Sequence, residues 1–229
     1  MHQRFALHLQ QGRCRRIAAF LCMTFAVIFL SAKLHAAVAA QDMQSALADI
    51  ERQWARISYQ SAATDDKAAF RALSQQAGEI AQQYPGQAEP LAWRGIVLCS
   101  YAEAMGGLQA LGTVTEARDL FLQAKRIDDH VMNGTVDAYL GTLYHKVPPW
   151  PIGFGDEAQA QRYFQRALAI NPGGIDPNYL YGYYLVERGQ KVAARTYLTR
   201  AQQAPIRSDH AEYDAGRRID IRDVLAKLN

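Results

Sequence analysis

Few residues of this chain could do chemistry, and they do not form a recognisable catalytic set. Beyond the first forty residues the histidines are His130, His145 and His210, and none has the spacing at which side chains share a metal ion. Cys99 falls in a predicted helix without a base partner in the sequence, which is typical of a buried, unreactive thiol. We therefore predict that the protein is not an enzyme and needs no metal or other cofactor.

Aromatic side chains offer binding chemistry instead. The stretch VPPWPIGFGD at 147–156 interrupts a helical pattern, because its three prolines cannot continue a helix. Prolines favour extended backbone and glycines permit turns, so this loop can hold Trp150 and Phe154 in fixed positions. Either both aromatics fold back onto the core, or one of them lines a pocket or meets a partner. Asp156 is placed to cap the following helix, with Gln159 three residues on.

The elements that must position these residues form a repeating pattern. In the clearest unit, Gly182 precedes Ala194 by twelve residues, and Leu198 and Ala201 follow at plus four and plus seven. This spacing fits the helix-turn-helix unit of a tetratricopeptide repeat (TPR). The skeleton recurs upstream with Gly141, Tyr144, Ala160, Phe164 and Ala167, and again with Gly95, Leu98, Ala117, Phe121 and Ala124. Three such units predict an all-α, TPR-like solenoid.

We predict one solenoid domain over residues 41–229. Its parts are an N-terminal helix pair at 43–84, a repeat with an insertion at 88–130, a repeat with the WPIGFGD insertion at 134–172, a regular repeat at 175–205 and a capping helix at 208–229. The last helix carries an apolar stripe with Arg217, Arg218 and Arg222 around it, so it should cover the final repeat.

Both insertions fall at the turn between the two helices of a unit. Gly141 and Ala160 are nineteen residues apart, and Gly95 and Ala117 are twenty-two apart, against twelve in the regular unit. Stacked repeats place equivalent turns along one edge, so the two insertions should meet and could build a shared site.

The second, fifth, ninth and twelfth positions of each unit should face the concave side of the solenoid. These are Glu89, Ala92, Ile96, Cys99, Thr135, Ala138, Thr142, His145, Asp176, Tyr179, Tyr183 and Val186. The face is aromatic and small, which disfavours a clamp for a peptide carboxylate and favours an apolar ligand or a partner helix. Tyr179 and Tyr183, one turn apart, are the expected contact pair. Asp176 should serve only as a helix cap before Pro177.

Residues 1–40 have the order of a cleavable secretory signal peptide. Basic residues precede an apolar run at 17–32, and the segment ends in small residues, with cleavage expected after Ala39 or Ala40. An uncleaved anchor and a twin-arginine signal are the alternatives. These forty residues hold five of the 25 basic and none of the 22 acidic residues, so the remainder carries a net charge of −2. This charge gives no reason to expect nucleic acid as a partner.

Three motifs in the second half of the chain carry a family resemblance. WPIGFGD at 150–156, NPGGID at 171–176 and NYLYG at 178–182 resemble a family of exported bacterial TPR proteins that carry this insertion, and more distantly the T-component proteins of TRAP solute transporters. The resemblance implies a helical repeat fold in the bacterial periplasm and a binding role.

We therefore expect a periplasmic or secreted TPR protein that acts as a non-catalytic, protein-binding adaptor or scaffold in the bacterial envelope. The alternative is an accessory component of solute uptake, resembling the T-component proteins, that binds a small apolar ligand in a pocket between repeats. The candidate binding residues are Trp150, Phe154, Tyr179, Tyr183 and His145. Membrane contact is expected only through the leader, if it is retained.

Overall fold

The computed structural model describes residues 37–60 and 66–228. The chain divides into two units, residues 1–45 and 46–229. Residues 37–45 of the smaller unit are helical, and the predicted signal peptide at 1–40 lies outside the described residues except for its last four positions. Within the described ranges, no helix combines the length and apolar character needed to cross a bilayer. The larger unit carries all the features discussed below.

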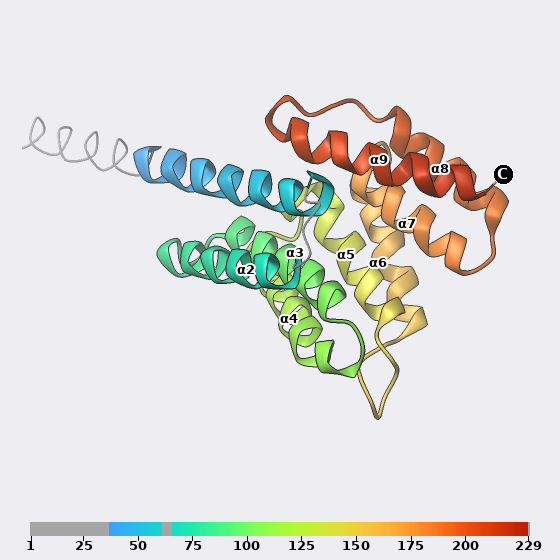
Figure 1. Ribbon diagram of the computed structural model, residues 1–229, viewed down its shortest axis with the longest axis horizontal. Coiled ribbons are helices and arrows are strands. Elements are labelled where there is room, and N and C mark those ends of the chain that lie inside the picture. The colour runs from blue at the N-terminus through green and yellow to red at the C-terminus, as the bar shows by residue number, and fades with distance from the viewer. Residues whose placement is uncertain (1–36, 61–65, 229) are drawn as a thin grey trace, which may run out of the picture. The chain divides into compact units, whose positions relative to one another are not determined.

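The described secondary structure of the larger unit is helical (Figure 1). Residues 46–60, called here the first helix, begin the unit. The later helices are α2 (Asp66–Gln83), α3 (Ala88–Met105), η1 (Leu108–Ala110), α4 (Leu111–Ile127), η2 (Val131–Gly134), α5 (Thr135–Lys146), α6 (Glu157–Ile170), α7 (Ile175–Glu187), α8 (Lys191–Gln203), η3 (Ser208–His210) and α9 (Ala211–Lys227).

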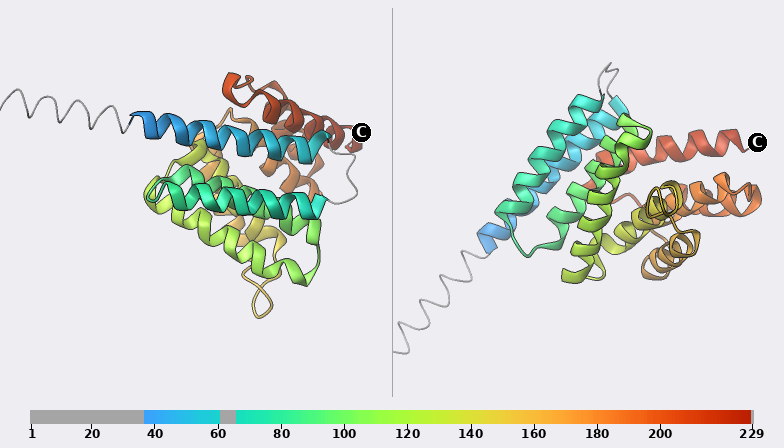
Figure 2. Two further views of the ribbon diagram at one scale, coloured as in Figure 1. Left: turned by 60° about the vertical axis from the view of Figure 1, so that its left-hand side comes forward. Right: turned by 90° about the horizontal axis from the view of Figure 1, so that it is seen from below.

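Consecutive helices pack side by side in pairs, α3 with α4, α5 with α6 and α7 with α8 (Figures 1 and 2). In each pair a glycine of the first helix faces a large side chain of the second. A Cβ atom placed on Gly141 would lie 2.9 Å from the Phe164 ring, and one on Gly182 would lie 2.8 Å from Leu198. Gly95 meets Phe121 in the same way. These are the small and large positions of the predicted units, and the missing Cβ lets the paired helices approach closely.

Apolar stripes at helical spacing form the core, as their periodicity predicts. In the first helix Leu47, Ile50 and Trp54 are buried, and in α2 Phe70, Leu73 and Ala77 are buried. Around α7 and α8 a cluster of buried side chains extends from α6 to α9. The fold therefore rests on continuous apolar contact between successive helices.

The two insertions have different structures. The extra residues of the first unit mostly lengthen its helices, since α3 and α4 have 18 and 17 residues against 13 in each of α7 and α8. Only Gly106 and Gly107, with φ of 64° and 63°, break the helical path. The expected loop is therefore largely wrong for the first insertion, because its alanine, leucine and glutamine residues support helix. The second insertion is a true loop at 147–156.

The helix α9 packs against two parts of the larger unit, the helix pair α7 and α8 and the first helix. Its residues Ile221 and Val224, and Leu228 directly after it, are buried in the cluster with α7 and α8, as the apolar stripe predicts. Its first half instead contacts the first helix, where the Tyr213 and Trp54 rings stack with centroids 5.0 Å apart. This segment is thus more than the simple end cap that the sequence predicts.

Candidate binding site

A cavity of about 520 Å³ lies among α3, α4, α5, α7 and α9. Both insertions reach it, through Gly106 to Leu111 and through Val147 and Pro148. The two segments also touch, since a Cβ atom placed on Gly153 would lie 3.5 Å from Leu111. The expectation that the insertions meet is therefore confirmed.

Three of the five predicted site residues line this cavity, namely Tyr179, Tyr183 and His145. Tyr179 is buried and Tyr183 is half-buried, and their ring centroids are 6.3 Å apart. Cys99 and Thr142, also expected on the concave side, line the same space. The helical spacing of the units thus places these side chains on one surface.

Three charged or titratable side chains that line the cavity, His145, Lys146 and Glu187, form a linked group with Glu157. His145 Nδ1 lies 3.0 Å from Glu157 Oε2, and His145 Nε2 lies 3.4 Å from Glu187 Oε2. Lys146 forms an ion pair with Glu187, and its Nζ atom lies 5.1 Å from the centroid of the Tyr183 ring. Each of these charges therefore has a partner within the chain.

The other two predicted residues, Trp150 and Phe154, lie in the loop at 147–156 and do not line the cavity. Their side chains have different surroundings. Phe154 folds back, with its ring 5.4 Å from that of Tyr144 and beneath the guanidinium of Arg118 at 4.3 Å. Trp150 points away and is 86% exposed. Asp156 caps α6 by accepting a hydrogen bond from the Gln159 amide at 3.0 Å, as predicted. One aromatic thus anchors the loop while the other is displayed.

Backbone contacts hold this loop in one shape. The amides of Ile152 and Gly153 donate to Pro149 O, and Gly155 N donates to Pro148 O at 2.9 Å. A Cβ atom placed on Gly155 would lie 1.9 Å from Val147 O, so the two arms of the loop touch at this glycine. The loop therefore presents Trp150 on a pre-organised support.

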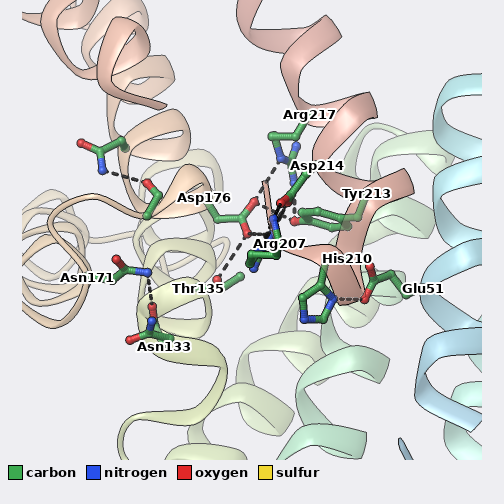
Figure 3. A network of polar contacts seen from close by, with 12 residues as sticks. Glu51, Asn133, Thr135, Asn171, Asp176, Arg207, His210, Tyr213, Asp214 and Arg217 are labelled. Carbon is green, nitrogen blue, oxygen red and sulfur yellow. Dashed lines mark hydrogen bonds and ion pairs between the residues drawn. The ribbon is translucent and has the colours of Figure 1, made fainter. Parts of the chain in front are cut away.

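Arg217 and Tyr139, which line the cavity, belong to a buried polar network. Figure 3 shows Arg217 of this network beside Asp176 and Tyr213. Arg217 of α9 donates from Nε to Asp176 Oδ1 at 3.1 Å. Its Nη2 atom donates to the hydroxyls of Tyr213 at 2.8 Å and Tyr139 at 3.1 Å. Its Nη1 atom donates to Asp220 at 3.3 Å. One guanidinium therefore joins α5, α7 and α9.

Arg217 stays positively charged within this network. Burial by itself lowers the pKa of Arg217, but the neighbouring tyrosines and Asp176 raise it, and the net pKa is above its ordinary value. Burial raises the pKa of Tyr139 to about 12, against an opposing effect of Arg217, so this hydroxyl stays protonated at neutral pH. Arg217 also lies over the Tyr179 ring, 4.7 Å from its centroid.

Two sequence predictions are wrong at this network. Asp176 is not a helix cap, because Gly174 occupies that position and Asp176 lies in the first turn of α7. It is 1% exposed and accepts hydrogen bonds from Arg217 and from the Tyr213 hydroxyl at 2.8 Å. The sequence pattern places Arg217 beside the apolar stripe of α9, but its side chain is buried. The spacing of four between Tyr213 and Arg217 places both on one face of α9, and this was the available signal.

The surroundings of Cys99 disfavour the reactive form of its thiol. Burial raises the pKa of the Cys99 thiol, with a further contribution from the Glu103 carboxylate, so the reactive thiolate is disfavoured. Across the described ranges, His, Cys, Asp and Glu side chains nowhere form a group of three that could hold a metal ion.

No protein-family model matches the sequence, and no match was found among the curated proteins.

Proposed function

We propose that this chain is a non-catalytic adaptor that binds a protein partner in the bacterial envelope, built as a TPR-like solenoid. The equivalent contacts of Gly95, Gly141 and Gly182 in three successive helix pairs support the repeat architecture. The resemblance at 150–182 supports the bacterial envelope.

The observation that carries the proposal is the display of Trp150. An indole that is 86% exposed, beside Ile152 at 60%, gains nothing from the fold of its own chain. The loop is nevertheless held by Phe154 and by its own backbone hydrogen bonds. Rigid, exposed aromatic side chains bind partners at little cost in conformational entropy, and tryptophan is enriched among the residues that dominate interface energy.

Apolar surface beside the loop indicates the character of the partner. The charged groups near the loop are already paired within the chain, Arg118 with Asp119 and Glu157 with His145. An apolar pocket would therefore complement the exposed Trp150 and Ile152 side chains.

The test compares two positions with the same exposure. Val192 on α8 is also 86% exposed, so a photo-crosslinking residue at position 150 and one at position 192 are matched in accessibility. The full chain, expressed in its own cells, should crosslink one specific protein from position 150 and not from position 192. Trp150→Ala should weaken binding of that purified protein by at least about tenfold, while Val192→Ala leaves it unchanged. Equal binding by both variants would refute the adaptor proposal.

Export is the second part of this proposal. Signal peptidase cleavage after Ala39 or Ala40 would leave Ala40 or Gln41 as the first residue of the chain recovered from cells. An intact N-terminus on cytoplasmic protein would contradict it.

A further inference from the structure

The cavity is separate from the displayed tryptophan and offers a second binding site. Neither Trp150 nor Phe154 lines it. Its volume of about 520 Å³ falls in the range of roughly 300–1,000 Å³ that is common for small-molecule sites. Binding in this cavity therefore does not require the partner protein that Trp150 is proposed to bind.

The cavity has an aromatic part and an aliphatic part. Its tyrosines come mainly from α7, with Tyr179 and Tyr183 one turn apart. Leu111 and Val114 of α4 and Val147 of the loop supply aliphatic surface. A planar ring system suits such a mixed lining, because it can contact tyrosine rings and aliphatic side chains at once.

The charges around the cavity argue against an ionic ligand. The two permanently cationic side chains that line it, Lys146 and Arg217, are paired with Glu187 and with Asp176 respectively. An anion would therefore have to displace an internal carboxylate. A cation would have to compete for tyrosine rings that already face a cation. Lys146 faces the Tyr183 ring, and Arg217 faces the Tyr179 ring.

The tyrosine hydroxyls supply the polar contact. Tyr179 and Tyr183 line the cavity, and within the described ranges neither hydroxyl is hydrogen-bonded, unlike that of the neighbouring Tyr184, which donates to Glu157 at 2.5 Å. Burial raises the pKa of Tyr179, so its hydroxyl is protonated and can donate. A ligand oxygen placed beside these rings would satisfy one or both donors.

We propose that this cavity binds an uncharged, mostly apolar small molecule with a planar ring system and a carbonyl or hydroxyl oxygen that accepts a hydrogen bond from Tyr179 or Tyr183. The helices α4 and α7 and the loop at 147–156 would enclose the ring system.

The test uses the neutral fluorescent ketone 6-propionyl-2-dimethylaminonaphthalene, whose emission moves to shorter wavelength in apolar surroundings. The full chain should bind it at one saturable site. The anionic dye 1-anilinonaphthalene-8-sulfonate, which is of similar ring size, should bind at least tenfold more weakly. Equal affinity for the two dyes would overturn the assignment to an uncharged ligand.

Substitutions locate the site. Val114→Trp fills the cavity and should weaken binding of the neutral dye at least tenfold, whereas Val192→Trp, which places the same side chain on an exposed surface, should not change it. Tyr179→Phe and Tyr183→Phe should together weaken binding about three- to tenfold by removing the donors. Unchanged binding by a folded Val114→Trp variant, judged by circular dichroism, would overturn the proposal.

A measurement on the unmutated chain covers the case in which Val114→Trp fails to fold. Cys99 lines the cavity, so bound dye should slow its modification by methyl methanethiosulfonate. The reaction is run at alkaline pH, because the pKa of the Cys99 thiol is raised, and is followed by peptide mass mapping of the full chain. A rate at Cys99 that does not change at saturating dye would also overturn the proposal.

Discussion

At the residue scale, Arg217 shows how one side chain can organise a site made by distant segments. It is buried, and its guanidinium donates four hydrogen bonds, to Asp176, Asp220 and two tyrosine hydroxyls. A buried guanidinium is tolerated only where such partners surround it, because the desolvation of an ion is costly. The same group also lines the cavity.

Removing Arg217 should therefore destabilise the protein strongly. Arg217→Ala leaves Asp176 buried without its main partner, and we expect a loss of about 3–5 kcal/mol in the free energy of unfolding. Urea denaturation measures this loss. Exposed Arg222→Ala on the same helix is the control and should cost less than about 0.5 kcal/mol. A loss below about 1 kcal/mol for Arg217→Ala would show that the network contributes little to stability.

A second residue-scale prediction concerns pH. His210 Nδ1 lies 2.5 Å from Glu51 Oε2, which raises the pKa of His210, while burial and Arg207 oppose the effect and Asp209 adds to it. Because the folded pKa is higher than the unfolded value of about 6.5, this contribution to stability is complete below that value. It is lost as pH rises through the folded pKa.

His210→Gln should therefore destabilise the protein more at pH 5.5 than at pH 8.5. The quantity to measure is the difference in unfolding free energy between the unmutated chain and the variant at each pH, since this difference cancels the contributions of other groups. A difference that stays constant or grows toward pH 8.5 would contradict the predicted role of the His210 to Glu51 contact.

At the element scale, the contact between a glycine and a large side chain sets the distance between paired helices. In the pair of α5 and α6, the glycine is Gly141 and the large side chain is Phe164. The loop that joins these two helices starts and ends on them, with Asp156 N donating to Tyr144 O at 2.9 Å. The separation of α5 and α6 therefore also controls how the loop and its tryptophan are held.

Gly141→Ala should force α5 and α6 apart. The added Cβ would lie 2.9 Å from the Phe164 ring, and we expect a loss of about 1–3 kcal/mol. Gly112→Ala in α4 is the matched control, because no atom lies within 4 Å of its added Cβ and alanine favours helix by up to about 1 kcal/mol. Thermal unfolding of both variants tests this prediction. Equal unfolding midpoints would mean that the close contact between Gly141 and Phe164 is not needed for stability.

At the scale of the whole molecule, α9 joins the two ends of the larger unit. Tyr213 stacks on Trp54, and the Tyr59 hydroxyl donates to Asp220 at 2.9 Å. A Cβ atom placed on Gly216 would lie 1.9 Å from the Tyr59 ring, so the two helices touch closely. The C-terminal helix thus makes contacts of very long sequence separation, in addition to those between successive helices.

This contact predicts coupled opening of the two ends. Tyr213→Ala should increase amide hydrogen exchange in residues 46–60 and in α9 together, because it removes a buried ring packed against Trp54 and Trp93. Exchange in α6 should change little. Faster exchange confined to α9 would indicate that the first helix is held independently of the C-terminus.

Local sequence determined the helices, their buried faces and the place where the helical pattern stops, because periodicity, glycine and proline act within a few residues. It also placed Tyr179, Tyr183 and His145 on one surface through helical spacing. Only the tertiary structure decided that Arg217 is buried, since the carboxylate that makes this possible lies 41 residues away in the chain. It also decided that Phe154 packs while Trp150 is displayed, because Arg118 and Tyr144 come from other helices to hold only the phenylalanine. Burial depends on partners brought together by folding, and a pattern of neighbouring residues does not contain them.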